Sequence, residues 1–112
     1  MEKSIARKQV SRVVKYGRET VVNEYQKFEF DKDIHREMLD EFDDGEMAAN
    51  NGVYGNVDDD ISIIDVSRVC QYLSNLISDF STEKDTEENF RYERCKKMYD
   101  YLKQWKGYEI TM

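Results

Sequence analysis

The sequence is poor in the residues and patterns that mark secreted, metal-binding and membrane proteins. It has two cysteines, one histidine, no proline and no apolar run close to the roughly 20 residues that a membrane-spanning helix needs. The two cysteines are too few for a disulfide framework, and they are not spaced as zinc ligands are. Because free cysteines are typical of a reducing compartment, we expect the protein in the cytoplasm. The first ten residues, MEKSIARKQV, carry charges where a signal peptide would have its apolar stretch. We therefore expect neither secretion nor membrane insertion.

Catalytic and cofactor motifs are also missing. No GxxxxGK[ST] or GxGxxG sequence is present to hold phosphates, and no pair of Glu-x-x-His motifs to hold two iron ions. His35–Glu37 matches one half of a zinc deaminase pattern whose cysteine half is absent, and Asp58–Asp60 lacks the alternating ligands of a calcium loop. Cys70 and Cys95 fall on predicted buried stripes, where inert structural thiols are expected. We predict a protein that is no enzyme and has no cofactor or metal, although its many carboxylates leave an acid–base pair open.

Charge is abundant instead, and it is separated along the chain. The 112 residues carry 24 acids and 17 bases, a net charge of -7. Residues 1–18 hold six bases and one acid, residues 29–65 hold thirteen acids and two bases, and residues 66–112 are balanced. With 39% hydrophobic and 12% aromatic residues, the chain can still build a core. The length suits one domain, which we place over residues 1–112.

Apolar periodicity predicts an all-α fold, a small four-helix domain. Apolar residues at spacings of three and four predict a basic helix over 3–28, in which Gly17 is unfavourable, with a break near Tyr16–Gly17 as the alternative. An acidic helix is predicted over 32–43 after an Asp31 N-cap, and a glycine- and asparagine-rich loop over 44–59. Asp58–Asp60 would cap the next helix, and two apolar stripes predict an antiparallel helical hairpin over 60–106.

The leading functional hypothesis rests on one face of the acidic helix. Five carboxylates fall within an arc of roughly 100° and are spaced by roughly 5–6 Å along the axis, comparable to phosphates along a DNA strand. They are Asp33, Glu37, Asp40, Glu41 and Asp44. A basic partner would relieve their mutual repulsion. We therefore expect a small acidic regulator or inhibitor that binds, as a DNA mimic, a protein with a basic surface such as a nucleic-acid-binding protein. A phage or mobile-element protein would suit this role, and a merely solvated face is the competing interpretation.

The basic N-terminal segment supports a second hypothesis, a nucleic-acid-binding regulator. The bases concerned are Lys8, Arg12, Lys15 and Arg18. Direct binding is less favoured than the protein partner, because the rest of the chain would repel phosphate. The bases would otherwise pair with the acidic helix of the same chain or of a homodimer partner. We expect no membrane binding, since the first 18 residues contain no Trp or Phe.

The last predicted helix carries aromatic residues over more than one face. Tyr92 and Tyr99 point to one side and are candidate partner-binding residues, unless this helix is the centre of the bundle. Their exposure would favour a third hypothesis, a self-associating structural or assembly protein. His35 is predicted on the apolar side of the acidic helix. There it is either a core-edge histidine with one hydrogen bond or a pH-sensitive contact.

Overall fold

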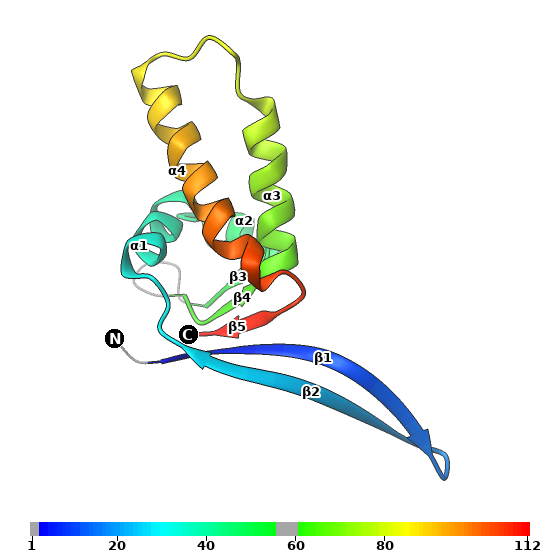
Figure 1. Cartoon of the computed structure of the whole chain (residues 1–112). Coiled ribbons are helices and arrows are strands. Elements are labelled where there is room, and N and C mark those ends of the chain that lie inside the picture. The colour runs from blue at the N-terminus through cyan, green and yellow to red at the C-terminus, as the bar shows by residue number, and fades with distance from the viewer. Residues whose placement is uncertain (1–2, 56–60) are drawn as a thin grey trace.

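The protein has a mixed α/β fold, and the predicted all-α, four-helix class is wrong. The computed structural model describes residues 3–55 and 61–112 (Figure 1). One five-stranded sheet, antiparallel throughout, has the order β2-β1-β5-β4-β3. Its strands are β1 (Ser4–Lys15), β2 (Arg18–Phe28), β3 (Val53–Tyr54), β4 (Ile63–Asp65) and β5 (Glu109–Thr111).

The helix predicted over 3–28 is instead a long hairpin made of β1 and β2. Lys15 pairs with Arg18 across the two-residue turn Tyr16–Gly17, whose φ angles of 53° and 73° are both positive. Such a type I′ turn matches the right-handed twist of the flanking strands. Val10 is an extra residue between two paired neighbours, a β-bulge. The helix prediction failed because neighbouring valines, as at Val13–Val14, fit helical spacing but also place one β-branched residue on each face of a strand.

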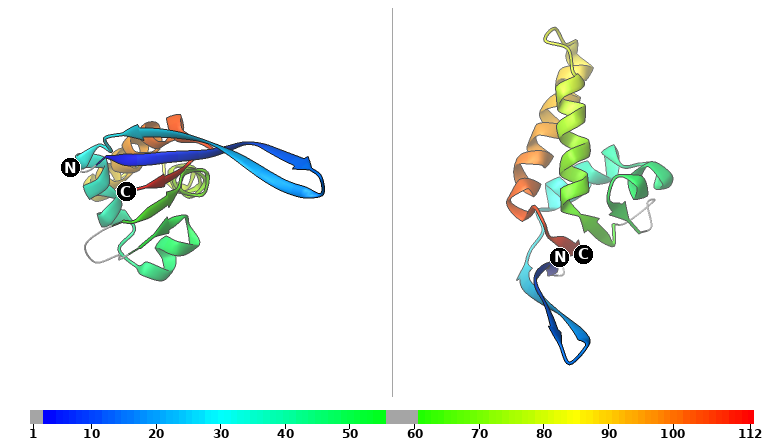
Figure 2. Two further views of the ribbon diagram at one scale, coloured as in Figure 1. Left: turned by 90° about the horizontal axis from the view of Figure 1, so that it is seen from below. Right: turned by 90° about the vertical axis from the view of Figure 1, so that its right-hand side faces the viewer.

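Only the base of this hairpin belongs to the body of the protein. β1 pairs with β5 at Ile5, Ala6 and Arg7 and nowhere further along. Beyond these pairs the hairpin projects alone, as Figures 1 and 2 show, and we call residues 7–25 the arm. The arm gives the molecule an elongated shape, with extents of 61 × 30 × 25 Å.

The helices gather on one side of the short strands (Figure 1). They are α1 (Lys32–Glu41), α2 (Gly45–Asn50), α3 (Val66–Asp79), α4 (Thr86–Leu102) and a short 3₁₀ helix, η1 (Lys103–Trp105). α3 and α4 lie side by side in the region of the predicted helical hairpin, but the segment before α3 is strand β4. The region predicted as a loop over 44–59 contains α2 and β3, and the predicted Asp58–Asp60 cap lies outside the described residues.

Aspartate caps begin all four of these α-helices. The Asp31 carboxylate accepts hydrogen bonds from the backbone N–H groups of Asp33 and Ile34, as the sequence predicts for α1. The other three helices follow the same pattern, with caps at Asp44, Asp65 and Asp85. Four of the acidic residues of this chain therefore cap helix N-termini, where a carboxylate also interacts favourably with the helix dipole.

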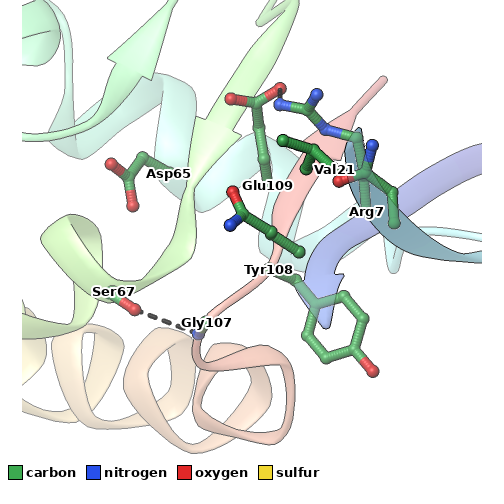
Figure 3. Close-up of a pocket in the computed structure, with 9 residues that line it drawn as sticks. Arg7, Val21, Asp65, Ser67, Gly107, Tyr108 and Glu109 are labelled. Atoms are coloured by element: carbon green, nitrogen blue, oxygen red, sulfur yellow. Dashed lines mark hydrogen bonds and ion pairs between the residues drawn. The ribbon is translucent and has the colours of Figure 1, made fainter. Parts of the chain in front are cut away.

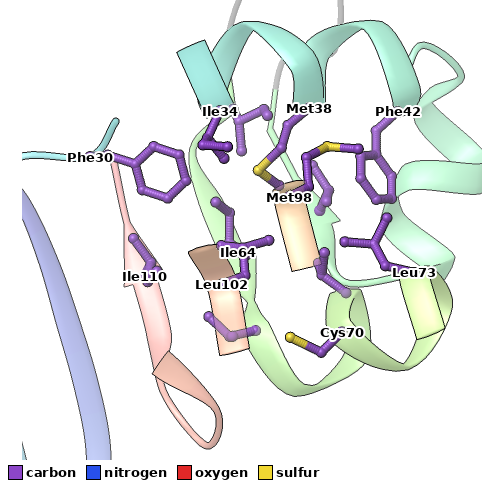
Figure 4. Packing of buried hydrophobic residues seen from close by; sticks show 14 of the residues in the cluster. Phe30, Ile34, Met38, Phe42, Ile64, Cys70, Leu73, Met98, Leu102 and Ile110 are labelled. Carbon is purple, nitrogen blue, oxygen red and sulfur yellow. The ribbon is translucent and has the colours of Figure 1, made fainter. Parts of the chain in front are cut away.

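The hydrophobic core lies between the helices and the short strands (Figure 4). Met38 of α1, Leu73 of α3 and Met98 of α4 pack with Ile64 and Ile110 of the sheet, and all five are fully buried. From the hairpin, this cluster includes Ala6, and Phe28 packs against it, whereas no residue of the arm belongs to it. The arm therefore receives no support from the core. No helix in the described part of the chain is long and apolar enough to span a membrane.

Candidate functional site

The arm carries most of the exposed apolar surface of the described residues. Seven of the eight large hydrophobic side chains that remain exposed belong to it. They are Val10, Val13, Val14, Tyr16, Val21, Val22 and Tyr25, and the eighth is Phe90 on α4. Val14 is 70% exposed and Tyr16 is 94% exposed. Because a two-stranded ribbon is marginally stable by itself, an arm of this length with apolar residues on both faces is typical of a binding element.

The four bases predicted for nucleic-acid contact all lie on the arm. Because β2 has no bulge, alternate residues along it lie on opposite faces of the arm, and each residue of β1 shares the face of its partner on β2. By this rule Lys8, Lys15 and Arg18 share one face, and Arg12 lies on the other. Between residues 7 and 18 the chain has five bases and no acid. Arg12 is partly neutralised by Glu19, whose carboxylate lies 2.8 Å from its Nε in an exposed ion pair. The arm is thus a basic ribbon, although not the basic helix that the sequence predicted.

The tip of the arm is a single exposed aromatic residue between two cations. Tyr16 occupies a positive φ of 53°, which a bulky residue adopts at a cost of about 1 kcal/mol. The Nζ of Lys15 lies 5.7 Å from the centre of the tyrosine ring, and Arg18 follows on the opposite strand. The periodicity of the sequence places Tyr16 and Gly17 in a helix or at a break in it, and so does not reveal that they form the turn of a hairpin. The signal available was Tyr-Gly between two valine-rich runs.

A polar groove of about 430 Å³ lies where the arm meets the body (Figure 3). Arg7, Gln9, Val21 and Asn23 line it from the arm, and Asp65, Ser67, Gly107, Tyr108 and Glu109 line it from the body. Arg7 forms an ion pair with Glu109 at 3.0 Å, and Ser67 Oγ accepts a hydrogen bond from the N–H of Gly107. These contacts fix the base of the arm. In the described ranges, no cluster of three or more His, Cys, Asp or Glu residues could hold a metal ion.

The predicted acidic face is largely occupied within the chain. Glu41 is buried and bonds to Arg91, Arg94 and Cys95, and Glu37 forms an ion pair with Lys97 at 3.2 Å. Burial alone would raise the pKa of Glu41, but the hydrogen bonds from Arg91 and Cys95 and the two guanidinium charges outweigh it and lower the pKa.

The other three acids of that face differ in what they contact. Asp33 pairs with Arg36 on the same helix, and Asp44 caps α2. Asp40 is exposed on α1. The five carboxylates therefore do not form a continuous solvent-facing stripe, because α4 covers the side of α1 that carries Glu37 and Glu41.

The two tyrosines predicted on α4 contact their own chain. Tyr92 packs edge-on against Phe80, with ring centres 5.6 Å apart, and Lys84 and Lys96 lie over its ring. Tyr99 is half-buried against the core. The exposed aromatic residue of α4 is Phe90 instead.

Three further side chains singled out in the sequence are partly or fully buried: His35, Cys70 and Cys95. His35 is half-buried, with its ring 6.4 Å from that of Phe30 and edge-on to it. Cys70 and Cys95 are both buried and free, and burial raises the pKa of each thiol. Raised thiol pKa values suppress nucleophilic chemistry at neutral pH.

Comparison with protein-family models, with curated proteins and with solved structures gives no significant match to this chain.

Proposed function

We propose that this protein is a non-enzymatic nucleic-acid-binding protein that contacts its ligand with the arm. The observation that carries the proposal is an isolated two-stranded ribbon that has five bases and two acids over residues 7–25 and ends in an exposed tyrosine. The major groove of B-DNA is wide enough for a two-stranded β-ribbon. Lys8, Arg12, Lys15 and Arg18 would contact phosphates, and Tyr16 would stack on or insert between bases.

The acidic body does not prevent this contact. Residues 29–112 carry a net charge of -11, which would repel phosphates at short range. The arm extends nine residues from Arg7 to Tyr16, about 30 Å at the usual rise of a strand. Exposed charges separated by more than the Debye length of about 8 Å are largely screened at physiological ionic strength. Repulsion would instead orient the protein so that the arm approaches first.

The strained backbone at the tip also supports a binding role. Asn-Gly is the sequence that a type I′ turn favours, whereas this turn has Tyr-Gly. A tyrosine at a positive φ and 94% exposed contributes nothing to the core. An exposed aromatic at a conformational cost is expected where the side chain acts on a ligand.

The acidic-face hypothesis stays a prediction, and the geometry favours it less. A DNA mimic needs its carboxylates directed to solvent, and Glu37 and Glu41 are directed to cations of α4. We place the protein in the cytoplasm, in keeping with its two free cysteines.

The test measures binding of the purified protein to fluorescently labelled duplex and single-stranded DNA by anisotropy over a range of salt concentrations. We compare the wild type with a variant in which Lys8, Arg12, Lys15 and Arg18 are changed to Gln. A matched control carries Gln at four exposed bases of the body, Lys32, Lys96, Lys103 and Lys106.

The wild type and the body control should bind with an affinity that falls steeply with salt. The arm variant should bind more weakly, and its slope of log K against log salt should flatten by about 0.9 for each duplex phosphate that the arm no longer neutralises. No binding by the wild type at low salt, or equal weakening in the two variants, would overturn the proposal.

A further inference from the structure

The outer edge of β2 is open along its whole length. β2 is the end strand of the sheet, and its eleven residues, Arg18–Phe28, pair only with β1 among the described residues. Every second residue of an edge strand directs its backbone N–H and C=O away from the sheet. An edge of this kind is a template for pairing with another chain.

This edge lacks the usual protection against such pairing. The chain contains no proline, and the β-bulge lies in β1 and not in β2. The central residues Thr20–Asn23 are uncharged, and both Val21 and Val22 are 42% exposed. The opposite edge of the arm, on β1, is protected by its bulge and by Lys8, Arg12 and Lys15. Two β1 edges would repel each other, whereas β2 carries equal numbers of acids and bases.

We propose that β2 pairs with β2 of a second copy of this chain, antiparallel and centred on Val21. In this register Arg18 lies opposite Glu24 of the second copy, and the symmetry repeats the pair. Thr20 lies opposite Val22, a β-branched pair that is favourable across strands. Two of the four charges of β2, Arg18 and Glu24, are therefore complementary in this antiparallel dimer, which makes a second copy the occupant of this edge.

The same register keeps the two bodies apart. The Tyr16–Gly17 turn of one copy lies level with residues 25–26 of the other, before β2 reaches its own body at Phe28. The two acidic bodies lie at opposite ends of a four-stranded ribbon, so their mutual repulsion is screened. Edge pairing uses backbone groups and leaves the side chains on both faces of each arm accessible to a ligand. The dimer does not depend on the proposed nucleic-acid binding.

The interface is small, since about seven residues of each copy pair. Interfaces of this size are weak and reversible, so we expect a monomer–dimer equilibrium that responds to protein concentration. Sedimentation equilibrium of the purified protein, without nucleic acid, measures it directly. The mass should rise from 13.4 kDa toward twice that value as the protein is concentrated.

Two exposed valines give a matched pair of variants. Val21→Lys places two lysines opposite each other at the centre of the pairing, and this variant should stay monomeric. Val14→Lys makes the same change on the same face of the arm but on β1, and it should dimerise as the wild type does. Because both positions are exposed, circular dichroism should report unchanged folding.

A charge exchange tests the register. Arg18→Glu should abolish the dimer by facing Glu24 of the second copy, and adding Glu24→Arg should restore it. A wild type that stays at 13.4 kDa at every concentration overturns the inference, as does equal disruption by the two lysine variants or no rescue in the exchange. A chain that binds DNA but stays monomeric overturns the dimer alone, and one that dimerises without binding DNA overturns the proposed function alone.

Discussion

Glu41 at the end of α1 accepts two hydrogen bonds from the guanidinium group of Arg91 on α4. The distances Nε···Oε1 and Nη2···Oε2 are both 3.1 Å, so the pair is bidentate. The Glu41 side chain is 5% exposed, and Arg94 Nη2 and Cys95 Sγ also lie within 3.4 Å of Oε1. This cluster locks α1 against α4.

Replacing Glu41 should destabilise the fold and alter its response to acid. We expect Glu41→Gln to lower the free energy of unfolding by about 2–3 kcal/mol at neutral pH, because the ion pairs are removed at a buried site. The folded-state pKa of Glu41 lies below its ordinary value of 4.5, so its contribution is present above pH 4.5 and is lost as the pH falls through the folded-state pKa. Urea unfolding at neutral and at several acidic pH values measures both effects.

The control for this prediction is Glu93→Gln, the same change at an exposed position on α4. It should alter stability by less than about 0.5 kcal/mol. Equal destabilisation of the two variants would contradict a stabilising role of the Glu41–Arg91 cluster. The same holds if the loss of unfolding free energy in Glu41→Gln is as large at acidic pH as at neutral pH.

The helical regions of α1, α3 and α4 could be predicted from the sequence because their signals are local, whereas α2 lies in the region predicted as a loop. Asp31 precedes a stripe containing Ile34 and Met38, and such a cap and stripe lie within a few turns of one another. The strands could not be predicted in the same way. β3, β4 and β5 have two or three residues each, too few to show a period of two, and they form only because distant segments pair.

The sequence singled out the four bases of the candidate site, but not the ribbon that carries them or the tyrosine at its tip. The bases at Lys8, Arg12, Lys15 and Arg18 are visible in the sequence, yet whether they lie on a helix or a ribbon depends on how valine pairs such as Val21–Val22 are read. Another cause explains why the predicted acidic face is not continuously exposed. Helical projection gives the angle between Glu37 and Glu41 and their neighbours, but it cannot say that α4 will lie against that side.

The two cysteines should be unreactive in the folded protein. Burial raises the pKa of Cys95 to about 12, assisted by the charge of Glu41 and the hydrogen bond to its carboxylate. Burial also raises the pKa of Cys70. At neutral pH we expect neither thiol to react with a chromogenic disulfide reagent until denaturant is added, after which both should react. A Ser78→Cys variant, exposed on α3, supplies the control that reacts at once. Rapid reaction of the wild type without denaturant would contradict this burial.

Gly52 should tolerate substitution poorly because the backbone just before β3 lies close to the start of α3. A Cβ built on Gly52 would lie 2.8 Å from Arg68 Cβ and 2.8 Å from the carbonyl oxygen of Asp65, and its φ is +92°. We expect Gly52→Ala to cost about 2–3 kcal/mol in urea unfolding, from the clash and the strained backbone together. Gly107→Ala is the control, since its φ of +88° is similar but its nearest contact is an ordinary 3.7 Å. It should cost about 1 kcal/mol. Equal losses of unfolding free energy in Gly52→Ala and Gly107→Ala would mean that the backbone near Gly52 moves and relieves the clash.

Tyr16→Asn separates the fold of the arm from its proposed function. Asn-Gly suits a type I′ turn better than Tyr-Gly, so NMR contacts between Lys15 and Arg18 across the turn should be at least as strong as in the wild type. DNA affinity should nevertheless fall about tenfold, because stacking on an aromatic side chain contributes about 1–3 kcal/mol per base. Tyr25→Asn, at the base of the arm, removes an exposed tyrosine away from the tip and should bind as the wild type does. Unchanged affinity in Tyr16→Asn would exclude the tip from the interface and confine DNA contact to the cations.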